Sequence, residues 1–137
     1  MNVIIDNNLW ISFVIGKKLA VMRSLFTSPE IRIYVCRELL DEFADVSSRL
    51  KLRKYITDND LQETYKLMNQ YCYFVQIHKK AISAIRDQKD LYLLSLAESV
   101  SADFILTGDK GLLSLQSHNQ TRIITYKEFT QIINYIT

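Results

Sequence analysis

Glycine and proline are scarce in this sequence of 137 residues, which contains three glycines and one proline. Both residues are abundant in linkers and disordered segments, whereas 48% of this chain is hydrophobic. A chain of this length is also large enough to bury a single core. We therefore expect one compact, helix-rich domain that spans residues 1–137.

Cysteine and histidine are few as well. Cys36 and Cys72 are isolated and lack the spacing of metal ligands, and His78 and His118 do not complete a zinc set with them. We interpret the two cysteines as reduced thiols in the core.

Long apolar runs are absent from the chain. No run approaches the length of a membrane span. The first apolar run, Val3 to Ile5, is interrupted at once by Asp6, so it does not resemble a signal peptide. These absences favour a cytoplasmic protein with no membrane partner.

The formal net charge of +2 does not by itself indicate nucleic-acid binding. Its distribution is more informative, because four basic residues fall in one short run: Arg49, Lys51, Arg53 and Lys54. Such a run is either a basic patch or an ordinary solvated helix end.

Strand and helix patterns alternate along the chain. Short β-favouring segments predict strands at 2–6, 31–35, 73–77, 103–106 and 122–125. Apolar residues at helical spacing predict helices at 8–15, 17–26, 37–50, 58–71, 90–100 and 126–136, with a turn or short helix at 111–115. Residues 78–89 are expected to be irregular or partly helical. The pattern predicts an α/β fold with three α/β/α layers and a central, mostly parallel sheet of four to five strands.

Asp6 directly follows the first predicted strand. In open α/β sheets, ligands bind at the carboxyl ends of the strands. A buried acid at this place costs folding energy unless a cation meets it. The alternative is that Asp6 caps the next helix, since Asp is a favoured N-cap residue.

Glu42 lies on the predicted helix 37–50, at the margin of the face formed by its apolar residues. From there its side chain can lean into a cleft. The alternative is an ordinary boundary glutamate that pairs with Arg49 or Lys51.

Asp90 opens the most apolar helix of the chain. It shares a helix face with Leu93, Leu94 and Ala97, so we expect it to point inward. The alternative is a plain helix start, with Asp87 as the N-cap and Asp90 in the first turn, where the helix dipole favours an acid.

Asp109 lies in a turn just after the predicted strand 103–106. Thr107 and Asp109 are residue types that organise turns without any other role. However, a buried strand that ends in a carboxylate repeats the arrangement seen at Asp6.

The four acids therefore share a placement at strand ends or at core-facing helix edges. If they converge, each pair about 4 Å apart repels by roughly 4 kcal/mol at an effective dielectric constant of about 20. Such a cluster persists with a divalent cation or with some acids protonated. Ligands that are all oxygen favour Mg²⁺ or Mn²⁺ over zinc.

Four segments resemble, in order and spacing, the acidic motifs of PIN-domain nucleases: Ile4–Leu9, Glu38–Phe43, Arg86–Asp90 and Leu106–Leu113. The likeness is strongest to small single-domain PIN proteins that serve as toxins of toxin–antitoxin pairs. It implies a PIN-like fold, Mg²⁺ or Mn²⁺ as cofactor, and hydrolysis of RNA by a metal-activated water. It also implies an antitoxin protein as partner and a homodimer.

The resemblance assigns roles residue by residue. The catalytic and metal-binding positions are taken by Asp6, Glu42, Asp90 and Asp109. Supporting positions are taken by an amide, an extra acid and a hydroxyl: Asn8, Asp87 and Thr107. The chain departs from the family at Asn7, where Thr or Ser is commoner.

Basic and aromatic residues near these acids suggest contacts to RNA. Arg86, Lys89 and Lys110 flank the acids and are candidates to hold phosphates, although solvated loop residues look the same in sequence. Trp10 and the tyrosines are candidates to stack on bases, but at helical spacing such residues more often fill the core.

Three other functions fit parts of the pattern. A PIN-like module can bind RNA or protein without cleaving, but the four intact acids disfavour it. A housekeeping RNA-processing nuclease without an antitoxin has the same acids. A receiver-type phosphoacceptor needs paired acids at the first strand end, where this chain supplies only Asp6.

Overall fold

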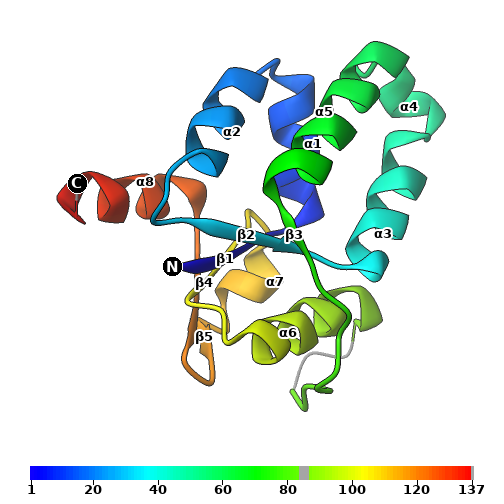
Figure 1. Cartoon of the computed structure of the whole chain (residues 1–137). Coiled ribbons are helices and arrows are strands. Elements are labelled where there is room, and N and C mark those ends of the chain that lie inside the picture. The colour runs from blue at the N-terminus through cyan, green and yellow to red at the C-terminus, as the bar shows by residue number, and fades with distance from the viewer. Residues whose placement is uncertain (84–86, 137) are drawn as a thin grey trace.

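A six-stranded sheet forms the centre of the described part of the chain (Figure 1). The computed structural model describes residues 1–83 and 87–136, without the side chains of residues 88, 89, 135 and 136. The strand order is β3-β2-β1-β4-β6-β5. The bounds are β1 Asn2–Ile5, β2 Arg32–Val35, β3 Tyr73–Phe74, β4 Phe104–Leu106, β5 Ser117–His118 and β6 Thr121–Ile124.

Helices cover both faces of this sheet. Figure 1 shows α1, α2, α3 and α5 on one side and α6 and α7 on the other. The three-layer α/β/α architecture predicted from the sequence is confirmed. The helices are α1 Asn7–Ile15, α2 Leu19–Phe26, α3 Arg37–Ser47, α4 Leu50–Arg53, α5 Asp58–Tyr71, α6 Gln88–Val100, α7 Lys110–Leu113 and α8 Tyr126–Ile136.

The central strands β1 and β4 are parallel and run in step, with Ile5 opposite Leu106. Their apolar side chains are almost entirely removed from water because helices lie on both faces. Burial of this apolar surface is the main favourable term in folding. Both strands also end at the same edge of the sheet, so the residues that follow β1 and β4 are neighbours.

The sheet contains one strand more than the four to five expected. The additional strand is β5, which has two residues and pairs antiparallel with β6 through a tight hairpin. At the opposite edge of the sheet, β3 is shorter than predicted and ends at Phe74, because only Tyr73 and Phe74 pair with β2. Every other strand pair in the described residues is parallel.

The helix predicted over residues 37–50 is interrupted. Helix α3 ends at Ser47, and α4 begins at Leu50. The hydroxyls of Ser47 and Ser48 donate to the backbone carbonyls of Ala44 and Asp45, which draws backbone acceptors into local contacts at the helix end. Helix α5 begins where expected, with a capping box between Thr57 and Asp60.

Trp10 is fully buried, and its ring centroid lies 5.5 Å from that of Phe26. It is therefore a core residue and does not stack on a base. Cys36 is buried, Cys72 is half-buried, and both are free thiols. In residues 1–83 and 87–136, no helix combines the length and apolar character needed to cross a membrane.

Candidate active site

Asp6 lies at the carboxyl end of β1, and its side chain is 5% exposed. Its backbone N–H donates to the carbonyl of Leu106 over 2.9 Å, which fixes it beside β4. Asp6 is the N-cap residue of α1, but its side chain makes no capping hydrogen bond. Instead, Oδ2 accepts a hydrogen bond from Thr107 Oγ1 over 2.7 Å. The capping alternative therefore does not explain this carboxylate.

Thr107 and Asp109 occupy the turn after β4. The Thr107 hydroxyl is buried and accepts the backbone N–H of Asp109 over 3.0 Å while it donates to Asp6. Asp109 also caps α7, because its Oδ2 accepts the N–H of Leu112 over 2.9 Å. One hydroxyl thus links the acids that follow two neighbouring strands.

Glu42 projects from α3 and is half-buried. Its Oε1 accepts hydrogen bonds from Asn7 Nδ2 over 2.8 Å and from the Tyr92 hydroxyl over 3.0 Å. The expected alternative, a pair with Arg49, is not what the structure shows, since Arg49 binds Asp45 over 3.3 Å. Glu42 is directed towards the strand ends.

The amide that contacts an acid here belongs to Asn7, whereas Asn8 is exposed on α1. The resemblance placed the supporting amide at Asn8 and treated Asn7 as the unexpected residue. Tyr92 was not among the candidates either. In the sequence, Tyr92 is marked only by its phenol group, which lies in an apolar helix two residues after an acid. An aromatic ring in such a helix is expected in the core and does not indicate a role at the site.

Asp90 lies in the first turn of α6, and the carbonyl of Asp87 accepts the backbone N–H groups that open this helix. The pKa of Asp90 is raised to about 6, first by burial and then, in decreasing order, by the charges of Asp109, Asp87, Asp6 and Glu42. All four acids of the predicted set therefore influence one another electrostatically. The sequence predicted that these acids converge, and their role in catalysis and metal binding stays a prediction.

The pKa of Asp6 is raised as well, first by burial and then by the charges of Glu42 and Asp109. The hydrogen bond from Thr107 acts in the opposite direction and favours the charged form. Burial, and then the charge of Glu42, raises the pKa of Tyr92, so this phenol stays protonated and donates.

The donors at this site fit a hard divalent cation in chemical type. All are carboxylate oxygens, and their mutual repulsion is what a cation relieves. Within the residues that the structure describes, no three acids, histidines or cysteines are gathered closely enough to ligate one ion as they stand. The carboxylates are neighbours rather than a closed ligand set.

The basic residues proposed to hold RNA are only partly described. Lys110 is exposed at the start of α7, next to Asp109. Arg86 lies outside the described residues, as does the side chain of Lys89. In the basic run near α4, Arg49 and Arg53 form exposed ion pairs with Asp45 and Asp58, which is the behaviour of a solvated helix end.

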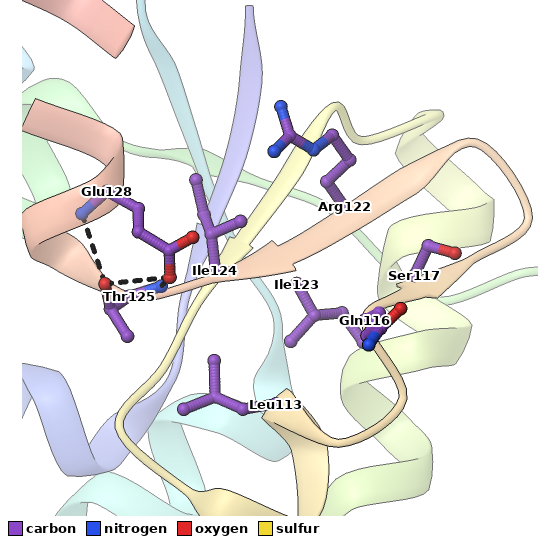
Figure 2. Close-up of a pocket in the computed structure, with 8 residues that line it drawn as sticks. All are labelled: Leu113, Gln116, Ser117, Arg122, Ile123, Ile124, Thr125 and Glu128. Carbon is purple, nitrogen blue, oxygen red and sulfur yellow. Dashed lines mark hydrogen bonds between the residues drawn. The ribbon is translucent and has the colours of Figure 1, made fainter. Parts of the chain in front are cut away.

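A separate cavity of about 620 Å³ lies along β6, away from the acids (Figure 2). Figure 2 shows Arg122 and Ile124 on one side of the strand and Ile123 and Leu113 on the other. The Glu128 carboxylate is occupied by Thr125, whose N–H and hydroxyl both donate to it. None of the four candidate acids lines this cavity.

Comparisons with known proteins agree with this arrangement. A family model described as PIN domain matches residues 2–111, a range that contains all four acids. A chain in the crystal structure of VapBC2 from Rickettsia felis, bound to a DNA fragment from their promoter, superposes with a TM-score of 0.59. The two are 13% identical, and the match covers 92% of this chain and 99% of that chain. A search of curated proteins finds no match.

Proposed function

Because this chain belongs to the PIN domain family, we propose that it is a ribonuclease that hydrolyses phosphodiester bonds of RNA with Mg²⁺ or Mn²⁺. The observation that carries the proposal is the gathering of acids at the carboxyl ends of the central strands, where Thr107 links Asp6 to Asp109. The charges of Asp6, Asp109 and Glu42 all reach Asp90 and raise its pKa. Structural ion pairs do not account for this cluster, because none of the four acids makes one with a described lysine or arginine.

In this proposal, Asp6, Asp90, Asp109 and Glu42 hold the ion. When bound, such an ion lowers the pKa of a water molecule and stabilises charge on the phosphate. Thr107 keeps Asp6 in one orientation through their 2.7 Å hydrogen bond. Lys110 lies beside Asp109 and is placed to bind a phosphate of the RNA.

We propose further that the ribonuclease is the toxin of a toxin–antitoxin pair. This rests on the resemblance of its motifs to small single-domain PIN toxins, and the shared fold with a chain of the VapBC2 structure is compatible with it. The expected partners are an antitoxin protein and a second copy of the chain. A housekeeping nuclease without an antitoxin remains the alternative, and induction of the gene in cells separates them, since a toxin arrests growth.

The decisive experiment incubates purified protein with RNA and Mg²⁺ or Mn²⁺. Cleavage is expected, and EDTA and the substitution Asp6→Asn should both abolish it. Asp41→Asn is the matched control, because Asp41 is exposed on α3 beside Glu42 and forms a surface ion pair with Arg37. RNA that is retained but never cleaved, at any metal concentration, contradicts the proposal and supports a binding module.

A further inference from the structure

The Glu42 carboxylate is held by two helices other than its own. Asn7 is the first residue of α1, and Tyr92 lies in the second turn of α6. Both donate to the same oxygen, Oε1, over 2.8 and 3.0 Å. Helices α1 and α3 cover one face of the sheet and α6 covers the other (Figure 1). The two hydrogen bonds to Glu42 therefore join the two helical layers across the end of the sheet.

We propose that Asn7 and Tyr92 are positioning residues that hold Glu42 by Oε1 and leave Oε2 to bind the divalent cation. The inference rests on the proposed function and assigns roles to residues outside the four acids. In the described part of the chain, both hydrogen bonds to this carboxylate end on Oε1. A carboxylate bound in this way presents its second oxygen in a fixed direction.

The orientation of the Asn7 amide supports this role. The residue is 2% exposed, and Nδ2 donates both to Glu42 and to the carbonyl of Leu39 over 2.9 Å. Rotating the amide by 180° would turn Oδ1 towards these two acceptors, so the donor must face α3.

The Asn7 amide also carries a cost. In the structure as described, Oδ1 is buried without a hydrogen-bond partner. A buried acceptor without a donor is unfavourable, because its hydrogen bond to water is lost and not replaced. Even so, a hydroxyl side chain would not replace the amide. Ser or Thr has a single hydroxyl hydrogen and cannot donate to both Leu39 and Glu42.

Tyr92 gives a second indication, and its hydroxyl oxygen also lies 3.4 Å from Asn7 Nδ2, which donates to it. Packing of α6 needs only an apolar ring at this position, which phenylalanine supplies equally well. The hydroxyl is used on Glu42, and a hydrogen bond to a charged acceptor is stronger than one between neutral groups. The phenol therefore contributes to the placement of the carboxylate and not merely to the core.

The test measures Mn²⁺ binding by calorimetry without RNA. We expect Tyr92→Phe to weaken the affinity for Mn²⁺ about 10-fold, within the range found for groups that orient metal ligands. Tyr65→Phe is the matched control. Tyr65 lies on α5, and its ring centroid is 5.6 Å from that of Phe43, which lies on α3 as Glu42 does. That variant should bind Mn²⁺ as tightly as the unmodified protein.

Asn7→Ser provides a second variant should Tyr92→Phe fold poorly by circular dichroism. It retains one donor and should also bind Mn²⁺ more weakly. In an RNA cleavage assay, both variants should lose activity at low Mn²⁺ and recover it as Mn²⁺ is raised. A purely structural role for the two residues predicts a loss that added metal does not restore.

Equal Mn²⁺ affinity of Tyr92→Phe and Tyr65→Phe overturns the inference, and so does an unmodified protein that binds no Mn²⁺. The proposed ribonuclease is judged separately. Cleavage by the unmodified protein together with unchanged Mn²⁺ binding in Tyr92→Phe leaves the nuclease standing and refutes the positioning role. Weakened Mn²⁺ binding in Tyr92→Phe, with no cleavage by the unmodified protein, supports the positioning role and refutes the nuclease.

Discussion

Thr107 Oγ1 lies 2.7 Å from Asp6 Oδ2, and this buried hydrogen bond ties the turn after β4 to the end of β1. The same hydroxyl accepts the backbone N–H of Asp109. A single oxygen atom therefore fixes the relative placement of Asp6 and Asp109, at the carboxyl ends of the central strands.

Replacing this hydroxyl with a methyl group should destabilise the fold. Thr107→Val keeps the shape of the side chain but leaves a buried carboxylate and a backbone N–H without their partner. We expect a loss of about 1–3 kcal/mol in the free energy of unfolding, measured with urea. Thr107→Ser retains the hydroxyl and serves as the control. A Val variant as stable as the Ser variant would contradict the role assigned to this bond.

The raised pKa of Asp90 predicts a pH dependence of stability. Its pKa is about 6 in the folded protein against an ordinary value of 3.8, so between these pH values the folded state binds more protons than the unfolded state. Stability should therefore fall as pH rises from about 4 to about 6. Asp90→Asn removes the part of this fall that Asp90 contributes. We expect the variant to gain about 1–2 kcal/mol over the unmodified protein at pH 7, less than the full shift because solvent screens the half-buried group. Parallel stability–pH curves for the two proteins would refute the shift.

Divalent cations should stabilise the folded protein. An ion that binds only the folded state adds about 2.7 kcal/mol at a concentration of about 100 times its Kd. The melting temperature should rise with Mn²⁺ and return on addition of EDTA. Compared with the unmodified protein, Asp90→Asn should have a higher melting temperature without metal and a smaller rise with metal. Thermal unfolding in metal-free and in Mn²⁺-containing buffer measures both effects.

Lys110 is expected to contribute one phosphate contact. Lys110→Ala should raise KM for RNA and reduce the dependence of binding on salt by the equivalent of about one counterion, with little change in kcat. Lys127→Ala is the control, because Lys127 is also exposed but lies on α8. Fluorescence anisotropy at several salt concentrations separates the two variants. Equal slopes would remove Lys110 from the RNA interface.

Much of the fold was predictable because its signals are local. The central strands are short apolar runs that end in turn-forming polar residues, and their helices have clear apolar faces. The strand β5 escaped prediction since its two residues, Ser117 and His118, have no β-favouring pattern and pair only through the hairpin. The break between α3 and α4 depends on serine hydroxyls that bind their own helix, a choice that periodicity does not reveal.

The acids could be found from sequence because carboxylates at strand ends and at a buried helix edge have few structural uses. Their supporting groups could be found only in part, since Thr107 was among the candidates whereas Asn7 and Tyr92 were not. Asn7 and Asn8 are identical residues side by side, and only the direction of the first turn of α1 decides which amide reaches Glu42. Tyr92 comes from a helix on the opposite face of the sheet, so its contact depends on tertiary packing.

The backbone hydrogen bond from Asp6 to Leu106 has a consequence for heat inactivation. It belongs to the middle of the sheet, where amide hydrogens exchange only when the whole domain opens. The carboxylate that follows β1 cannot come loose on its own while the strands stay paired. Loss of function on heating should therefore follow the same curve as loss of the fold, with one midpoint for both.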